Sequence, residues 1–300
     1  MALNARGSFV ALVTPFDNKG RIDWKSVENL VSWQIEQGTD GIVCCGATGE
    51  SMTISEAEKK KMVAACVKIA GNRIAIIGNS GTADTRQSVR LTEQMFKLGA
   101  SGTLVATPYY NKPTQRGCIL HFSEIAKVGL PVIVYNNPGR VGVRLEAETI
   151  AKLGEVSGIA ACKDSTGDIR LIQKIRELSS IPILAGDDDL TYETLFQGGS
   201  GAISVIGNLF PKAWKTLISL ALEKKWEPAK KIADRFYPLC KAMFLEPNPQ
   251  CLKFAMSWLG KCQGTLRLPF VPTTQTTQEQ IKRELIALGS PFFISRRTAV

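Results

Sequence analysis

The stretch IAACKDSTG, residues 159–167, has the pattern of a buried strand that ends in a turn and leads into a helix. Its small and apolar residues run directly into Lys163, and the turn-forming residues Asp164 to Gly167 follow. A short apolar run followed by a turn and a helical segment is the repeating unit of a parallel α/β fold. The lysine at the end of the strand needs an explanation, because an ammonium group is costly to bury.

Seven similar apolar runs are spread along the chain. They cover residues 8–13, 41–45, 74–78, 102–107, 132–136, 182–186 and 201–205. Each run is followed by a helical segment, and eight strand–helix units match a (β/α)8 TIM barrel better than an open doubly wound sheet. We therefore expect an α/β protein whose catalytic barrel occupies residues 1–225.

Helix signals support this division of the chain. Ser55 and Glu58 form a capping box, Gly71 marks the end of that helix, and Asp84 caps the next one. Further helices are expected over residues 213–226, 228–244, 248–260 and 278–288. They predict a C-terminal helical domain, residues 226–300, whose last segment (289–300) shows no clear period.

The composition is that of a soluble globular enzyme, with 44% hydrophobic and 21% charged residues. The net charge of +10 raises nucleic acid as a partner, but the basic residues are interspersed with acids and no nucleic-acid-binding motif is present. We expect no nucleic-acid partner, and we interpret the charge as favouring solubility or anionic substrates. The chain also lacks a long apolar run and a convincing signal peptide, so we expect no membrane association and a cytoplasmic location.

Metal and redox chemistry find little support in the sequence. The eight cysteines are irregularly spaced without a CxxC pair, which predicts buried free thiols. His121 is the only histidine, which argues against histidine-based triads and multi-histidine zinc sites and predicts a structural role. No GxGxxG follows a strand, so a nicotinamide cofactor is disfavoured. We expect no metal or organic cofactor.

Candidate catalytic residues gather at the carboxyl ends of the predicted strands, where TIM barrels place their active sites. Burial penalises the ammonium form of a lysine, and the neutral amine attacks carbonyl groups, so Lys163 is a candidate for Schiff-base chemistry. A salt bridge to Asp164 or to another acid at the barrel rim is the alternative. Tyr135, which ends the neighbouring strand, favours the catalytic interpretation, because a phenol there can move protons to and from an imine.

Other strand ends carry candidate binding groups. The stretch CGATGES, residues 45–51, offers backbone N–H groups and the Thr48 hydroxyl to a carboxylate, or it is simply a tight turn that needs glycine. Arg140 could clamp a carboxylate or lie exposed on the surface. The acidic stretch GDDD, residues 186–189, would repel a phosphate group and argues against a phosphosugar substrate.

Six motifs together resemble the dihydrodipicolinate synthase / N-acetylneuraminate lyase family. They are GATGES, TPYYNKPTQRG, YNNPGRVG, CKDSTGD, AGDDD and GAISV, in the family's order and spacing. The resemblance spans about residues 8 to 260 and implies a class I aldolase barrel, usually a homotetramer built as a dimer of dimers. It implies condensation of pyruvate with aspartate semialdehyde (aspartate 4-semialdehyde) to give 4-hydroxy-tetrahydrodipicolinate, a reaction of lysine and diaminopimelate biosynthesis.

The resemblance also implies residue roles. Lys163 would form the imine with pyruvate, and Tyr135 would transfer protons. Tyr110 corresponds to a tyrosine that reaches across the tight dimer into the neighbouring site.

For the substrates, the resemblance assigns Thr48 to the pyruvate carboxylate and Arg140 to the carboxylate of the semialdehyde. Gly186 and Ile203 match positions that line the pocket. Arg140 favours the synthases over the sialic acid lyases, which lack that arginine, and over other keto-deoxy sugar acid aldolases.

Two departures from the family pattern stand out. Ala47 replaces a threonine whose hydroxyl would link the two tyrosines, which predicts a slower synthase or, as an alternative, a 2-oxo acid binding protein with impaired catalysis. Thr82 and Arg86 stand at the positions of the Asn and Glu that hold lysine in feedback-inhibited relatives. A cation there would repel the effector, so we expect weak inhibition by lysine.

Overall fold

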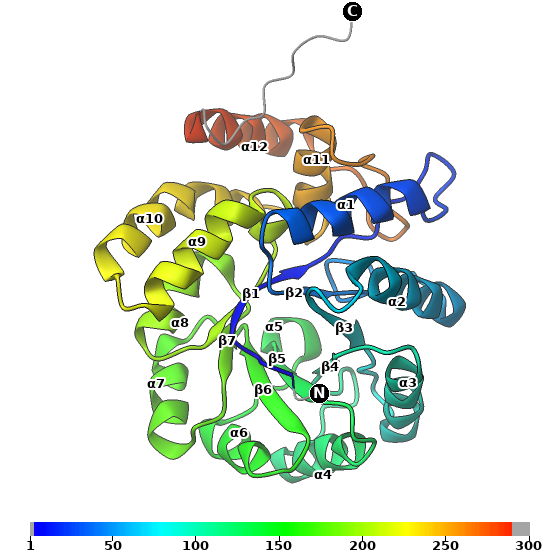
Figure 1. Ribbon diagram of the computed structural model, residues 1–300, viewed down its shortest axis with the longest axis vertical. Helices are drawn as coiled ribbons and strands as arrows, with labels where there is room; N and C mark the ends of the chain where they lie inside the picture. The colour runs from blue at the N-terminus through cyan, green and yellow to red at the C-terminus, as the bar shows by residue number, and fades with distance from the viewer. Residues whose placement is uncertain (1–2, 290–300) are drawn as a thin grey trace, which may run out of the picture.

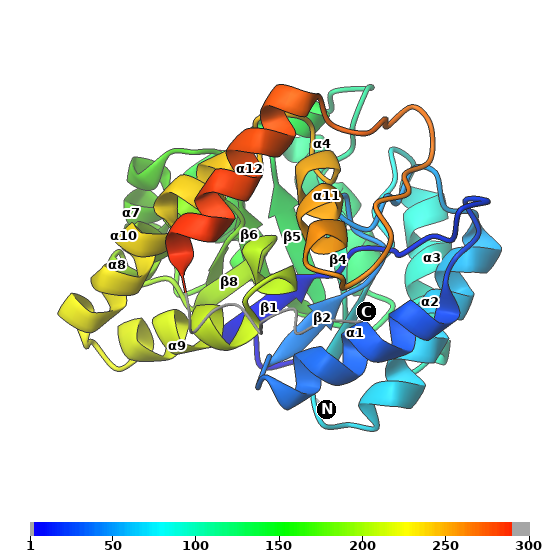
Figure 2. The ribbon, with the colours of Figure 1, turned by 90° about the horizontal axis from the view of Figure 1, so that it is seen from above.

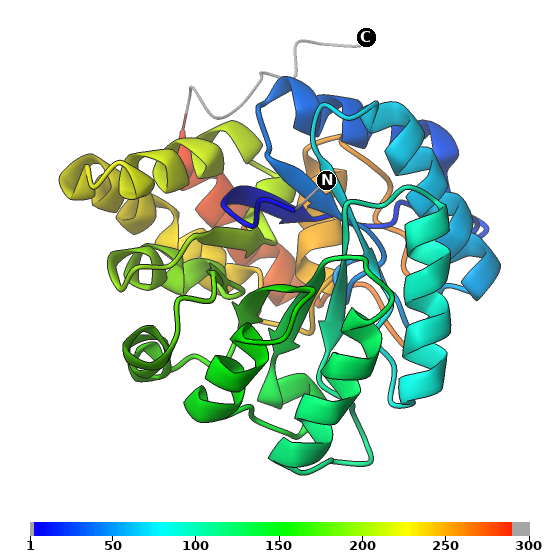
Figure 3. The same ribbon diagram turned by 60° about the horizontal axis from the view of Figure 1, so that its bottom comes forward.

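A computed structural model describes residues 3–289, which form a closed barrel of eight parallel strands in sequence order. The strands stand in the middle of the molecule with the helices around them (Figure 1 and Figure 3). The strands are β1 (Gly7–Ala11), β2 (Gly41–Val43), β3 (Ala75–Asn79), β4 (Gly102–Ala106), β5 (Val132–Asn136), β6 (Ile159–Asp164), β7 (Ile183–Ala185) and β8 (Gly201–Ser204). This confirms the predicted TIM barrel, and each strand lies within one of the predicted apolar runs or extends one residue beyond it at one end.

Helices alternate with the strands around the barrel. They are α1 (Trp24–Glu36), α2 (Glu56–Ala70), α3 (Thr85–Lys97), α4 (Gln115–Ala126), α5 (Pro138–Val141), α6 (Ala147–Gly154), α7 (Ile169–Leu178), α8 (Thr191–Phe196) and α9 (Pro211–Leu222). Short 3-10 helices, η1 (Asp188–Leu190) and η2 (Ile206–Asn208), follow β7 and β8. The predicted capping box of Ser55 and Glu58 is present at the start of α2, and Asp84 caps α3.

The barrel interior is filled by side chains and is not a channel. The buried apolar residues that pack together there are Ala5, Phe9, Ala11, Val43, Ile77, Leu104, Ile133, Ala161, Leu184 and Ile203. Alternate residues of each strand face this interior, and the others pack against the surrounding helices. A filled interior leaves the loops at the strand ends as the place for a substrate site.

Three helices extend the barrel at its C-terminal side: α10 (Trp226–Ala242), α11 (Gln250–Trp258) and α12 (Gln275–Leu288). Figure 2 shows α12 lying along α10 and α11, which are its neighbours in the packing. Phe236 of α10 packs edge-on against Phe210 and Trp214, with ring centroids 5.3 and 5.9 Å apart, so the extension shares a core with the barrel. The boundary at 225/226 falls at the start of α10, and the division into two domains stays a prediction. Residues 290–300 of the tail lie outside the described residues.

The cysteines and the histidine agree with their predicted structural roles. All eight cysteines are free thiols, and all but Cys262 are buried. His121 is buried on α4, where its Nδ1 lies 3.0 Å from the Thr85 hydroxyl. Burial lowers the pKa of His121 to about 4. Within residues 3–289, no helix is long and apolar enough to span a membrane.

We predict that closure of the barrel depends on the absence of a side chain at Gly201. A Cβ atom there would lie 2.0 Å from the carbonyl oxygen and 2.7 Å from the amide nitrogen of Gly7, and these backbone atoms cannot move away without disturbing the pairing of β8 with β1. Gly201→Ala should lower the free energy of unfolding by about 1–3 kcal/mol or more, measured by urea denaturation.

Gly117→Ala is the matched control, because a Cβ atom at Gly117 on α4 meets its nearest neighbour at 3.4 Å, an ordinary contact. This variant should be as stable as the parent or more stable, since alanine favours a helix over glycine. Equal stability of the two variants would contradict the prediction.

Candidate active site

A pocket opens at the carboxyl ends of the strands. It is lined by Ala11, Val43, Gly46, Ala47, Thr48, Leu104, Tyr135, Asn137, Arg140, Lys163, Gly186, Asp187, Val205, Phe244 and Asn248. Six of the eight residues singled out from the sequence are among them: Ala47, Thr48, Tyr135, Arg140, Lys163 and Gly186. The strand ends therefore bring together residues that are more than a hundred positions apart in the chain.

Lys163 and Tyr135 lie side by side because of the strand register. They are paired residues on the parallel strands β6 and β5, so their side chains point into the same space. Lys163 is only 6% exposed, and its Nζ lies 4.2 Å from the centroid of the Tyr135 ring. The buried amine thus faces the pocket with a phenol beside it.

The salt bridge considered as the alternative for Lys163 does not form. The Asp164 carboxylate accepts hydrogen bonds from the Asn136 amide at 2.9 Å and from the Thr166 hydroxyl at 2.7 Å. Successive residues of a strand point to opposite faces, which directs Asp164 away from the barrel interior. Asp164 therefore holds the turn after β6 in place and does not pair with Lys163, whose amine faces the pocket.

The Tyr135 phenol is surrounded by polar groups of its own chain. Its oxygen accepts a hydrogen bond from the Asn137 amide at 2.7 Å. Burial raises the pKa of Tyr135, but Lys163, the Asn137 amide and the Ser165 hydroxyl lower it, and the net pKa lies below its ordinary value. A phenol that gives up its proton more readily is better suited to proton transfer near neutral pH.

Gly186 makes room for the lysine side chain. A Cβ atom at this position would lie 2.0 Å from the Ser165 hydroxyl oxygen and 2.7 Å from Cε of Lys163. Glycine is therefore required by the close approach of the β6 and β7 loops, and this physical reason supports the sequence prediction that Gly186 lines the pocket.

Asn248 joins the two predicted carboxylate-binding residues and was not predicted from the sequence. Its side-chain amide donates to the Thr48 hydroxyl at 2.9 Å, and its backbone carbonyl oxygen accepts from the Arg140 guanidinium at 3.3 Å. It lies in the link between α10 and α11. The only signal in the sequence was a polar residue between two prolines, which does not show that this link covers the mouth of the barrel.

Two predicted site residues lie elsewhere in the single chain. Tyr110 is 94% exposed and has a positive φ of 68°, in the loop after β4. Ile203 is fully buried on β8 in the barrel interior and is not among the residues that line the pocket. Their assigned roles stay predictions.

The acidic stretch after β7 divides between the pocket and the scaffold. Asp187 lines the pocket, and burial raises the pKa of its carboxyl group while Lys163 opposes this shift. Asp188 accepts hydrogen bonds from the backbone N–H groups of Val205 at 2.9 Å and Ile206 at 2.7 Å, and burial raises its pKa to about 6. Asp188 therefore holds the loop after β8 and leaves Asp187 as the carboxyl group that faces the pocket.

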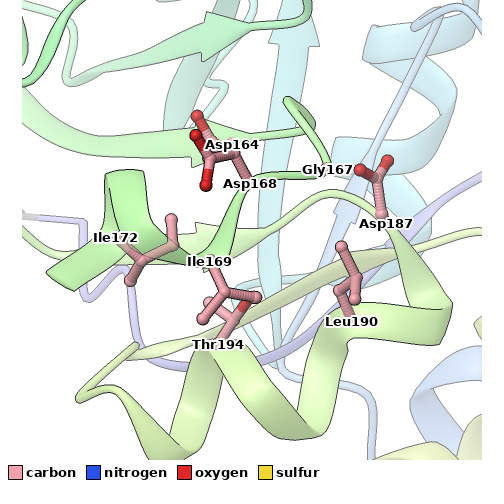
Figure 4. A pocket seen from close by; sticks show the side chains of 8 residues that line it. All are labelled: Asp164, Gly167, Asp168, Ile169, Ile172, Asp187, Leu190 and Thr194. Atoms are coloured by element: carbon pink, nitrogen blue, oxygen red, sulfur yellow. The ribbon is translucent and has the colours of Figure 1, made fainter.

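A second, smaller hollow shares Asp187 with the pocket (Figure 4). Its other two carboxyl groups already have partners, since Asp164 binds Asn136 and Thr166, and Asp168 caps α7 and pairs with Arg144 at 2.8 Å. Within residues 3–289, no group of three or more His, Cys, Asp or Glu residues is arranged to hold a metal ion.

Known proteins match almost the whole chain. The 4-hydroxy-tetrahydrodipicolinate synthase of Thermodesulfovibrio yellowstonii is 41% identical over 287 residues, which are 95% of this chain and 98% of the relative. The enzyme of the same name from Bartonella bacilliformis is 39% identical over 288 residues, with coverage of 95% and 98%.

Solved structures agree in fold. The chloride-inhibited dihydrodipicolinate synthase from Acinetobacter baumannii, complexed with pyruvate, matches with a TM-score of 0.93 and 39% identity, covering 95% of this chain and 99% of that one. The synthase from Aquifex aeolicus matches with a TM-score of 0.91 and 38% identity, covering 93% and 97%.

A closed barrel with a lysine in a pocket at the carboxyl ends of its strands is the architecture of class I aldolase-type lyases. The model of the dihydrodipicolinate synthetase family matches residues 4–288, and the chain belongs to this family. The family expected from the six sequence motifs is therefore confirmed.

We predict that Gly186→Ala removes activity without unfolding the protein. The added methyl group would lie 2.7 Å from Cε of Lys163 and 2.8 Å from the backbone carbonyl oxygen of Asp164, so the lysine side chain would have to leave its place and the end of β6 would have to shift slightly. A misplaced catalytic group of this kind typically costs about 100-fold in rate. Turnover of pyruvate and thermal unfolding of the variant would be compared with those of Gly117→Ala. Unchanged turnover in Gly186→Ala would show that the lysine does not need this space.

Proposed function

We propose that this protein condenses pyruvate with aspartate 4-semialdehyde to give 4-hydroxy-tetrahydrodipicolinate, through an imine on Lys163. The observation that carries the proposal is the Lys163 amine, buried in the pocket 4.2 Å from the Tyr135 ring centroid. The names of the curated relatives and the pyruvate complex of the Acinetobacter baumannii structure support it.

The chemistry follows from the groups in the pocket. The Lys163 Nζ attacks the keto carbon of pyruvate, and loss of water gives the imine. Removal of a proton from the methyl carbon gives an enamine, which attacks the aldehyde carbon of the second substrate. The amino group of that substrate then attacks the imine carbon, closes the ring and releases Lys163. The overall condensation eliminates one molecule of water and needs no oxidant or reductant.

The other pocket residues divide between proton transfer and binding. Tyr135 transfers protons during imine formation, consistent with the lowered pKa of its phenol. The Thr48 turn (residues 45–51) binds the pyruvate carboxylate, and the Arg140 guanidinium binds the carboxylate of the semialdehyde. Both are tied to Asn248, which fixes the distance between the two binding groups.

A partner subunit completes the site in this proposal. Tyr110 is too exposed in the single chain to act in its own pocket. In a tight dimer, the second copy of the chain would cover Tyr110, and the Tyr110 side chain would enter the pocket of that copy. We propose a homotetramer built from two such dimers, located in the cytoplasm.

Reductive trapping tests the imine directly. Incubation with pyruvate and sodium borohydride should leave a covalent adduct on Lys163, located by peptide mass spectrometry, because the reduced imine no longer hydrolyses. Lys163→Arg should carry no adduct. Turnover with aspartate 4-semialdehyde and with sugar aldehydes then decides the acceptor. A wild-type protein without an adduct on residue 163 would rule out the proposed mechanism.

Ala47→Thr tests whether the missing hydroxyl limits the rate. One positioned proton-transfer group is typically worth about 10²–10⁴-fold, so restoring it should raise kcat by at least about tenfold. Ala47→Val is the matched control, because valine adds nearly the same volume without a hydroxyl. If the threonine and valine variants turned over equally, the hydroxyl would not take part in proton transfer in this protein.

A further inference from the structure

A buried ion pair connects the Thr48 turn to helix α11. Lys253 Nζ lies 2.5 Å from Glu50 Oε1, and both side chains are completely inaccessible to solvent. Glu50 lies within this turn (residues 45–51), and Lys253 lies on α11 of the C-terminal extension. The two residues are far apart in the chain, so this pair can form only after the extension has packed onto the barrel.

The remaining polar atoms of the pair also have partners. Glu50 Oε2 accepts a hydrogen bond from the backbone N–H of Arg267 at 3.0 Å. Lys253 donates to the carbonyl oxygen of Thr265 at 2.7 Å, and its Nζ lies 4.0 Å from the centroid of the Phe16 ring. The ammonium and carboxylate groups are therefore held in one geometry from several sides.

The turn that the pair holds is conformationally demanding. Cys45 and Glu50 have φ values of 57° and 56°, in the left-handed region that residues with a Cβ atom rarely adopt. Ala47 and Thr48, which line the pocket, lie between these two residues. Such a backbone conformation persists only where the surrounding structure enforces it.

Neither Glu50 nor Lys253 lines the pocket, so the pair can affect the reaction only through the two elements that it joins, the turn and α11. Two packed apolar side chains would often stabilise a protein as well as a buried ion pair does, whereas an ion pair also fixes direction and distance. Stability alone therefore does not explain the use of charges at this place.

We propose that Lys253 and Glu50 are positioning residues, which fix the Thr48 turn in the shape that binds the substrate carboxylate. This inference rests on the proposed function for the identity of the substrate. By this proposal the C-terminal extension shapes the site through two contacts. Lys253 of α11 holds the turn, and Asn248, just before α11, holds Thr48 itself.

Lys253→Met tests the proposal, with Lys261→Met as the matched control. Lys261 also belongs to the C-terminal extension and also lies over an aromatic ring, with its Nζ 3.9 Å from the Trp33 centroid, but it is not paired with Glu50. The pyruvate concentration for half-maximal borohydride trapping should rise at least tenfold in Lys253→Met. It should stay within twofold of wild type in Lys261→Met.

A second variant and a second measurement keep the test decisive. Glu50→Gln/Lys253→Met removes both charges, so it avoids an unpaired buried carboxylate if the single variant does not fold. It should melt near the wild-type temperature and still need at least tenfold more pyruvate. Wild-type half-saturation in either folded variant would overturn the proposal.

Hydrogen exchange separates this inference from the proposed function, because it needs no substrate. The amides of Glu50 and Ser51 donate within the turn, to the carbonyl oxygens of Ala47 and Gly46, at 3.1 Å each. They should exchange at least tenfold faster in the Lys253 variants than in Lys261→Met. Unchanged exchange would overturn the positioning role, whereas failure of the wild type to trap pyruvate would overturn the proposed function alone.

Discussion

The site depends on placing one amine inside the end of a closed barrel. Lys163 is held there by strand register, since pairing of β5 with β6 sets it beside Tyr135 and the alternation of side chains turns Asp164 away. Gly186 then leaves the space that the lysine side chain occupies. The geometry at the centre of the pocket is thus set by the pairing of the strands.

The barrel and the gathering of Lys163 and Tyr135 in one pocket could be predicted because they follow from local patterns. Apolar runs and helix caps are written in consecutive residues, and once the barrel is known, all strand ends meet at one edge. Asn248 and the pair of Glu50 with Lys253 could not be predicted in this way. They are contacts between residues about two hundred positions apart, and no periodicity shows how a helical extension packs on a barrel.

The surroundings of the Tyr135 phenol change the interpretation of Ala47, which replaces a threonine of the family pattern. The sequence alone suggests that proton transfer from Tyr135 is interrupted, because alanine has no hydroxyl group. The structure gives Tyr135 the Asn137 amide at 2.7 Å and places the Ser165 hydroxyl close enough to lower its pKa. Polar groups on the same chain therefore favour the ionised form of the Tyr135 phenol. Proton transfer from Tyr135 depends on these groups as well as on the residue at position 47.

The order of contacts along the chain has a consequence for synthesis on the ribosome. The barrel closes when β8 pairs with β1, and Asn208 then bonds the backbone of Ala11 and Val13. The contacts of Lys253 and Arg267 with Glu50 come later still. On a growing chain one edge of β1 therefore stays unpaired until β8, which ends at Ser204 of the 300 residues, has emerged, and an unpaired strand edge is a place where chains associate wrongly during synthesis.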